Sequence, residues 1–123
     1  MSDISSLVDL YIAAWNEPDA EHRRELIARV WADAPTYVDP MLASDGREGI
    51  DAMIRDVQNR FPGHRFSRTG DVEAHHDRLR FRWELASAAG EPVVEGTDFA
   101  VLAAGRLLSV TGFFDRVATP AEG

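Results

Sequence analysis

The chain has 123 residues, of which 45% are hydrophobic and 28% charged, with a formal net charge of −8 and no cysteine. The acidic balance argues against nucleic acid as a partner, and the lack of cysteine excludes disulfides and thiolate zinc sites and fits a reducing compartment. The length predicts one domain, with a core over about residues 4–115 and a flexible tail over 116–123. No apolar run approaches the roughly 20 residues of a membrane span and the start has no secretory pattern, so we expect a cytoplasmic protein.

Two helical patterns open the chain. From Ile4 to Asn16, apolar residues recur at helical spacing, with Tyr11 and Trp15 on the inward stripe. Glu17-Pro18-Asp19 breaks the pattern and opens a second helix, which runs to about Ala32. The second helix is predicted to bury Leu26, Ile27, Val30 and Trp31 and to expose a solvated face of His22, Arg23, Arg24 and Glu25.

A short strand follows, over Thr36-Tyr37-Val38-Asp39-Pro40. Pro40 fixes its own φ and pushes Asp39 toward an extended conformation. Asp39 is therefore predicted to be a carboxylate at the rigid end of a strand, followed by a loop over residues 41–46. We expect the elements on both sides of this strand to form a cup around the carboxylate.

A third helix is predicted over residues 47–61, where Pro62-Gly63 ends it. From there the hydrophobic period changes to two, which indicates strands. The predicted strands cover residues 64–76 with an interruption at Gly70, about 79–85, 92–103 and 106–115. Because helices and strands segregate along the chain, the predicted class is α+β with an antiparallel sheet.

Asp98 is the second carboxyl group of interest. Alternation along its strand places it on one face with small and apolar residues, Val94, Gly96, Ala100 and Leu102. The more apolar face of the last strand holds Leu108, Val110, Gly112 and Phe114. If the two faces point the same way, desolvation can raise the pKa of Asp98 by about 3–5, which leaves it protonated near neutrality. The alternative is that Asp98 pairs with an arginine or caps a bulge.

Other patterns give weaker indications. His75-His76-Asp77 suggests a metal site, but neighbouring residues of a strand point to opposite faces, so no metal site is predicted. Trp83 alternates with Phe81 and Leu85 and lies either in the core or beside a pocket. The sequence has no phosphate loop, serine elbow or dinucleotide fingerprint, and no cofactor is expected.

Five short segments carry a family resemblance through their order and spacing. They are LVDLYIAAWN over residues 7–16, YVDP over 37–40, GREGI over 46–50, GTDF over 96–99 and RLLSV over 106–110. Over about residues 6–115 the chain resembles the nuclear transport factor 2-like superfamily, especially its SnoaL-like and ketosteroid isomerase-like branches. The resemblance implies a cone, in which a strongly curved antiparallel sheet wraps around the N-terminal helices and leaves a pocket at its open end.

The resemblance also implies a reaction. Asp39 falls on the position of the base in ketosteroid isomerases, and Tyr11 and Asp98 fall on the positions of two donors to a developing enolate oxygen. The implied chemistry is proton abstraction next to a carbonyl, or polyketide cyclisation with the same aspartate. Ile54 stands where some of these isomerases have another tyrosine. The expected ligand is a hydrophobic small molecule in contact with Trp15, Met53, Phe61, Trp83 and Phe114.

Two other roles follow from the same resemblance. The chain could be a non-catalytic ligand-binding module, or a dimeric interaction module. Relatives of this kind usually pair through the convex side of the sheet, so a homodimer is expected. Here that side is predicted to carry Glu95, Thr97, Phe99, Val101, Ser109, Thr111 and Phe113.

Overall fold

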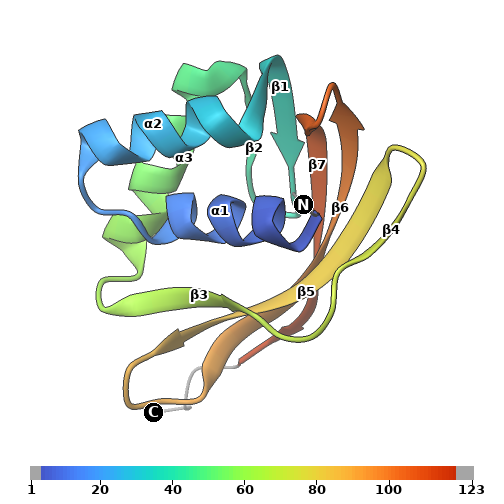
Figure 1. Cartoon of the computed structure of the whole chain (residues 1–123). Coiled ribbons are helices and arrows are strands. Elements are labelled where there is room, and N and C mark those ends of the chain that lie inside the picture. The colour runs from blue at the N-terminus through green and yellow to red at the C-terminus, as the bar shows by residue number, and fades with distance from the viewer. Residues whose placement is uncertain (1–3, 119–123) are drawn as a thin grey trace.

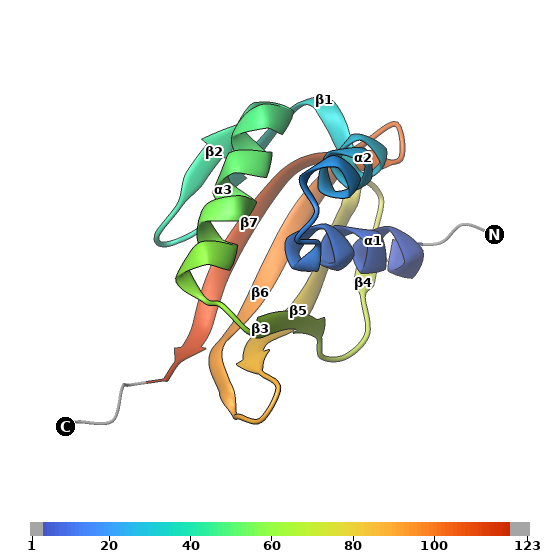
Figure 2. The same ribbon diagram turned by 90° about the vertical axis from the view of Figure 1, so that its left-hand side faces the viewer.

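The computed structural model describes residues 4–118, which form three helices packed against one curved sheet (Figure 1). The helices are α1 (Ile4–Asn16), α2 (Ala20–Val30) and α3 (Gly46–Arg60). The strands are β1 (Trp31–Val38), β2 (Ala43–Asp45), β3 (His64–Arg68), β4 (Glu73–His75), β5 (Arg78–Ser87), β6 (Pro92–Ala103) and β7 (Arg106–Val117). Figure 2 shows the sheet curving around α1 and α3, which confirms the predicted α+β class.

The strands follow the order β2-β1-β7-β6-β5-β3, with β4 paired to β5 outside this path. The pair of β1 and β7 is parallel, while the other pairs within residues 4–118 are antiparallel, so the sheet is mixed. Val38 at the end of β1 lies opposite Thr111 of β7. The next residue of β7, Gly112, lies opposite Asp98 of β6. The parallel register therefore leads the chain from β1 directly to the place where β7 meets Asp98.

Several boundaries differ from the prediction. The loop expected over residues 41–46 contains β2, which pairs with β1. The long strand expected over 64–76 is divided into β3 and β4, with Gly70 between them at a φ of 124°, a backbone conformation that favours glycine. Strand β7 continues to Val117, into the expected tail, of which residues 119–123 lie outside the described part of the chain.

A bulge in β7 reverses the predicted direction of Leu108. Val101 lies opposite Ser109 and Leu102 opposite Leu107, so Leu108 is an extra residue in the register. Leu107 is 2% exposed, whereas Leu108 is 39% exposed. The prediction that Leu108 lies on the inner face was wrong, because the extra residue shifts the alternation by one.

Helix α2 carries a buried ion pair that its sequence pattern did not indicate. Arg23 is 1% exposed, and its Nε donates to Oδ1 of Asp51 on α3 at 2.6 Å. The prediction that Arg23 belongs to a solvated face was therefore wrong, because its partner lies on a helix distant in sequence. The helix also ends at Val30, two residues earlier than predicted, where Trp31 takes an extended conformation and begins β1.

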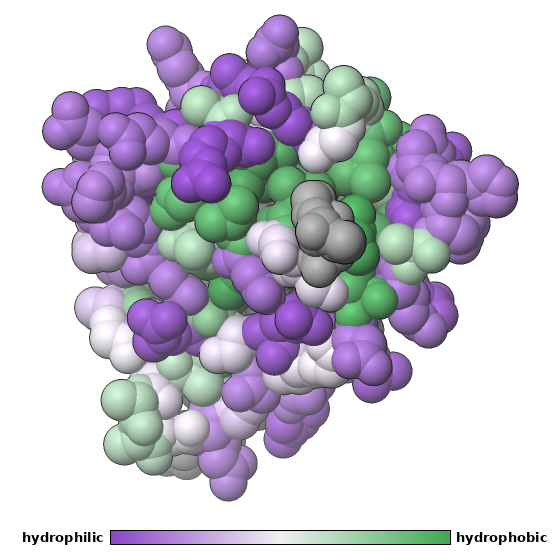
Figure 3. All heavy atoms as spheres, viewed as in Figure 1, coloured by the Kyte–Doolittle hydropathy of each residue, from purple (hydrophilic) through white to green (hydrophobic). Residues whose placement is uncertain are grey.

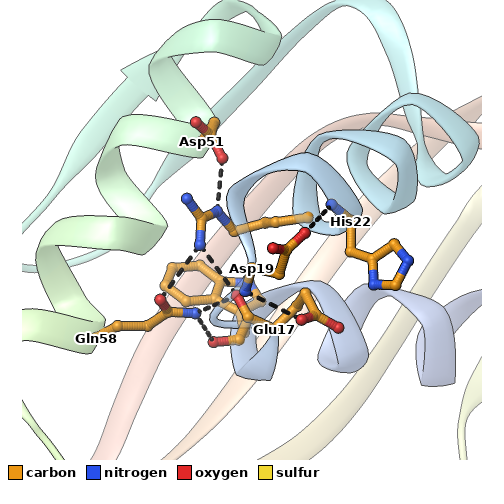
Figure 4. Close-up of polar contacts among 7 residues, drawn as sticks. Glu17, Asp19, His22, Asp51 and Gln58 are labelled. Carbon is orange, nitrogen blue, oxygen red and sulfur yellow. Dashed lines mark hydrogen bonds and ion pairs between the residues drawn. The ribbon is translucent and has the colours of Figure 1, made fainter.

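Figure 4 shows how this ion pair extends into a network between the three helices. The Arg23 guanidinium also donates to the carbonyl of Glu17 at 3.0 Å and to Gln58 Oε1 at 3.3 Å. Gln58 Nε2 donates in turn to the carbonyls of Trp15 and Glu17, at 3.0 and 2.9 Å. Carbonyls at the end of a helix lack partners within it, so these bonds fix the end of α1 against α2 and α3.

The surface combines two kinds of region. On the face seen in Figure 1, hydrophobic residues gather along α1 and toward β1 and are surrounded by hydrophilic residues (Figure 3). On the outer side of the sheet, Phe99 is 40% and Phe113 56% exposed, within the strip expected to form a homodimer. The homodimer itself stays a prediction. No helix within residues 4–118 is long and apolar enough to cross a membrane.

We expect Asp51→Ala to lower the free energy of unfolding by about 3–5 kcal/mol, because it leaves the Arg23 guanidinium buried without its carboxylate. Urea unfolding at pH 7 measures the change. The control is Glu73→Ala, which breaks the ion pair between Glu73 and Arg80. The side chains of Glu73 and Arg80 are 66% and 64% exposed. That change should cost less than about 1 kcal/mol. A similarly small cost for Asp51→Ala would show that the network does not stabilise the helix arrangement.

Candidate active site

A cavity of about 560 Å³ lies between α1, the end of α3 and the inner face of the sheet. Its walls are mostly apolar, with aromatic rings from Trp15, Phe61, Phe66, Trp83 and Phe114. This volume and composition are typical of small-molecule sites. A second hollow of about 390 Å³ lies beside β4 and β5, but its lining is mostly polar and contains neither Asp39 nor Asp98.

Asp98 lies on the inner face of β6 and is 3% exposed. Tyr11 Oη of α1 donates to its Oδ2 at 2.8 Å, and Trp83 Nε1 of β5 donates to its Oδ1 at 2.9 Å. Burial raises the pKa of Asp98 to about 7, although the hydrogen bonds from Tyr11 and Trp83 act in the opposite direction. Within residues 4–118 no arginine pairs with this carboxyl group. Asp98 is therefore a buried carboxyl group that can hold a proton near neutral pH.

Asp39 follows the end of β1 and also borders the cavity. Its Oδ1 accepts hydrogen bonds from the backbone N–H groups of Met41 and Leu42, both at 2.8 Å. Its Oδ2 accepts a bond from Tyr37 Oη at 2.6 Å. Burial, together with the charges of Asp98 and Asp39, raises the pKa of Tyr37, so the phenol stays a donor. The carboxylate is thus held in one orientation by three donors from its own strand and turn.

Gly112 brings the two carboxyl groups together. A Cβ atom at this position would lie 2.8 Å from Asp98 Oδ1, 3.2 Å from Asp39 Cβ and 3.5 Å from Tyr37 Oη. Both acids therefore lie beside the same point of β7, and glycine is needed there because a side chain would displace one of them. We call Tyr11, Asp39 and Asp98 the floor of the cavity.

Comparison with protein-family models and with curated proteins finds no match. A solved structure from Agrobacterium tumefaciens strain C58, described as a candidate isomerase of the SnoaL-like family, is 42% identical and superposes with a TM-score of 0.86 over 90% of this chain and 96% of that one. The chain belongs to the SnoaL-like family.

More distant structures show the same fold. A candidate ketosteroid isomerase from Kribbella flavida is 20% identical, with a TM-score of 0.69 over 96% of this chain and 82% of that one. An NTF2-like protein of unknown function from Cytophaga hutchinsonii is 15% identical, with a TM-score of 0.67 over 94% and 92% of the two chains. The resemblance stated from sequence motifs is thereby confirmed at the level of family and fold.

The SnoaL-like chain brings most of the predicted site residues to one cavity. Tyr11, Asp39 and Asp98 border it, as do four of the five predicted ligand-binding residues, Trp15, Phe61, Trp83 and Phe114. Met53 does not line the cavity and is 7% exposed in the core. Met53 lies outside the lining because only the last turn of α3, with Val57 and Arg60, borders the cavity.

Two hydrogen-bond donors of the site were not predicted. Tyr37 shares its strand face with Asp39, two residues later, and this spacing could have indicated their contact. Trp83 was expected to pack in the core or near a pocket, but its indole N–H also bonds Asp98. Ile54, which stands where some ketosteroid isomerases have a tyrosine, is fully buried, and the additional phenol here comes from β1.

The two histidines do not point to opposite faces as predicted. Their Nδ1 atoms lie 3.2 Å apart, because His76 is in a turn with a φ of 54° rather than in a strand. Within residues 4–118 no group of three or more histidine, cysteine, aspartate or glutamate residues could hold a metal ion.

We expect Asp98→Asn to change the pH dependence of stability. The pKa of Asp98 is raised from 3.8 to about 7 in the folded protein, so its ionisation opposes folding. Between about pH 4 and about pH 7, the free energy of unfolding of the wild type should fall by up to about 4 kcal/mol relative to that of the asparagine variant. Above about pH 7 the difference between the two free energies should stay constant. Asparagine can still accept from Trp83, and its amide can donate to Tyr11. Urea unfolding across this range, with Asp45→Asn at an exposed position as control, measures the effect. If the unfolding free energies of the wild type and Asp98→Asn depend on pH in the same way, Asp98 is not a buried carboxyl group that holds a proton near neutral pH.

We expect Gly112→Ala to lower the free energy of unfolding by about 1–3 kcal/mol, because the added methyl group overlaps the Asp98 carboxyl group. The matched control is Gly90→Ala, in an exposed turn where the new Cβ meets only the rotatable hydroxyl of Ser87 within 3 Å. Urea unfolding of the two variants gives the comparison. Equal stabilities would mean that the two acids do not crowd Gly112.

Proposed function

We propose that this SnoaL-like protein is an isomerase that moves a proton from the carbon next to a ketone carbonyl to the far end of an adjacent carbon–carbon double bond. The observation that carries the proposal is the convergence of Asp39 and Asp98 on Gly112 inside one apolar cavity. Pairs of carboxyl groups in different surroundings commonly divide the roles of base and hydrogen-bond donor. The 42% identity to a candidate SnoaL-like isomerase supports the same class of reaction.

Asp39 is the base. Its carboxylate takes the proton from the carbon next to the ketone, and the electrons of that C–H bond form the carbon–carbon double bond of the enolate. The negative charge passes to the carbonyl oxygen. Asp39 then gives a proton back to another carbon of the conjugated system, so the isomerisation needs no other reactant. The three donors to Asp39 hold it in place through both steps.

Tyr11 and Asp98 stabilise the enolate oxygen. Trp83 donates to Oδ1 of Asp98, so the proton of the neutral acid resides on Oδ2, beside the Tyr11 hydroxyl. When Asp98 is neutral, its Oδ2 no longer has to accept the hydrogen bond from Tyr11. The Tyr11 and Asp98 hydroxyl groups can then donate a hydrogen bond to the ligand oxygen. Removal of one donor of this kind typically lowers the rate by about 10²–10³.

The test is isomerisation of 5-androstene-3,17-dione, followed by the absorbance of its conjugated product. Asp39→Asn should lower kcat by about 10²–10⁴, because it removes the base but keeps the size of the side chain. Asp45→Asn, at an exposed position just before α3, should leave the rate unchanged. Exchange of the ketone's neighbouring hydrogens with deuterated water, measured by NMR on smaller unsaturated ketones, tests the proton transfer without assuming a steroid.

Each outcome has a clear meaning. Exchange in the wild type that is lost in Asp39→Asn supports the isomerase. Ligand binding without any exchange would overturn it in favour of a non-catalytic binding module, which needs only the cavity. Exchange that persists in Asp39→Asn would overturn the role of Asp39.

A further inference from the structure

Arg60 is the one cation among the cavity-lining residues within 4–118. It is the last residue of α3, and the next residue, Phe61, also lines the cavity. Asp56, four residues earlier on the same helix, is its ion-pair partner, with Nε and Oδ2 3.1 Å apart. The two side chains are 56% and 49% exposed, so this pair contributes little and can be exchanged for another anion.

Arg60 lies at the exposed mouth of the cavity, whereas Tyr11 and Asp98 of the floor are buried. The other exposed lining residues are Met41 and Val117, at 71% and 56%, and with Arg60 they define the mouth. Figure 2 shows the end of α3 at the same end of the molecule as the end of β7. Val117 lies opposite Val94, and Asp98 follows Val94 by four residues on β6, which is about 13 Å along a strand.

The charges at the two ends define the orientation of a ligand. The floor contains the Asp39 carboxylate, which repels an anion, and the walls between are apolar and cannot solvate one. With a net charge of −8, the protein as a whole also repels anions. An anionic group on a ligand is therefore expected at the mouth, beside Arg60, while an uncharged carbonyl oxygen fits the floor.

We propose that the ligand is an elongated, mainly apolar carbonyl compound with an anionic group at its far end, and that Arg60 selects it by binding that group. The carbonyl end of this assignment rests on the proposed isomerase, whereas the anionic end rests on Arg60 alone. The guanidinium offers several N–H donors at fixed angles and binds carboxylate, sulfonate and phosphate oxygens through charge-assisted hydrogen bonds. Such a compound spans the cavity from Tyr11 to Arg60.

Two fluorescent probes with the same aromatic body test the proposal. 8-Anilinonaphthalene-1-sulfonate carries an anionic group, and N-phenyl-1-naphthylamine is its neutral counterpart. Both are titrated into the wild type, Arg60→Gln, Arg60→Lys and the control Arg55→Gln, which changes an exposed arginine of α3 outside the cavity lining. Mutual displacement of the probes shows that they share one site. The readout is the ratio of the two Kd values, in which general effects on the cavity cancel.

Arg60→Gln should raise the Kd of the sulfonate probe about five- to tenfold and change the Kd of the neutral probe by less than about twofold. Arg60→Lys should retain part of the preference, and Arg55→Gln all of it. Equal weakening of both probes, or no weakening of either, would overturn the assignment. These titrations involve no turnover, so a negative isomerase assay does not affect the conclusion about Arg60. Likewise, absence of a preference for the anionic probe does not affect the proposed role of Asp39, which the isomerase assay tests.

Discussion

The buried carboxyl group of Asp98 is the constraint on which the arrangement of the molecule depends. A carboxyl group that is 3% exposed costs free energy unless its oxygens are bonded, and here the donors come from two different elements, α1 and β5. Room for this arrangement comes from glycine. A Cβ at Gly96 would lie 2.4 Å from the Trp83 ring, and one at Gly112 would meet Asp98 itself. Helix α1 is therefore held at one depth against the sheet by a polar contact as well as by packing.

The parallel pairing of β1 and β7 adds the second acid. An antiparallel neighbour would send the end of β1 away from Gly112, whereas the parallel register brings Asp39 beside it. The turn after β1 then supplies two backbone donors to the same carboxylate. The buried network of Arg23, Asp51 and Gln58 fixes the end of α1 that carries Trp15, an aromatic residue of the cavity wall. Sheet topology thus places the acids, and the helix network holds part of the wall.

The positions of the two acids could be predicted from the sequence, but the groups that donate hydrogen bonds to them could not. Strand alternation placed Asp98 inside, and Pro40 indicated a rigid position for Asp39, because both signals are local. Arg23 was misassigned because its charge resembles those of its exposed neighbours, while its partner Asp51 lies 28 residues away. Leu108 was misplaced because nothing in the local pattern marks the bulge. Contacts set by register and by the packing of distant helices cannot be deduced from periodicity alone.

The contact between Tyr11 and Asp98 also sets a condition on any use of the floor. While Asp98 is ionised, the phenol hydrogen is committed to it, and the charge of Asp98 would repel an enolate. Burial shifts the acid toward its neutral form, at the cost of stability near neutral pH, and this form removes both obstacles at once. Trp83 also determines which oxygen of Asp98 carries the proton, because the indole N–H donates to Oδ1 and leaves the proton to Oδ2. A cavity that served only to enclose apolar ligands would gain nothing from this costly group, and this is the physical reason for the proposal that Asp98 stabilises charge.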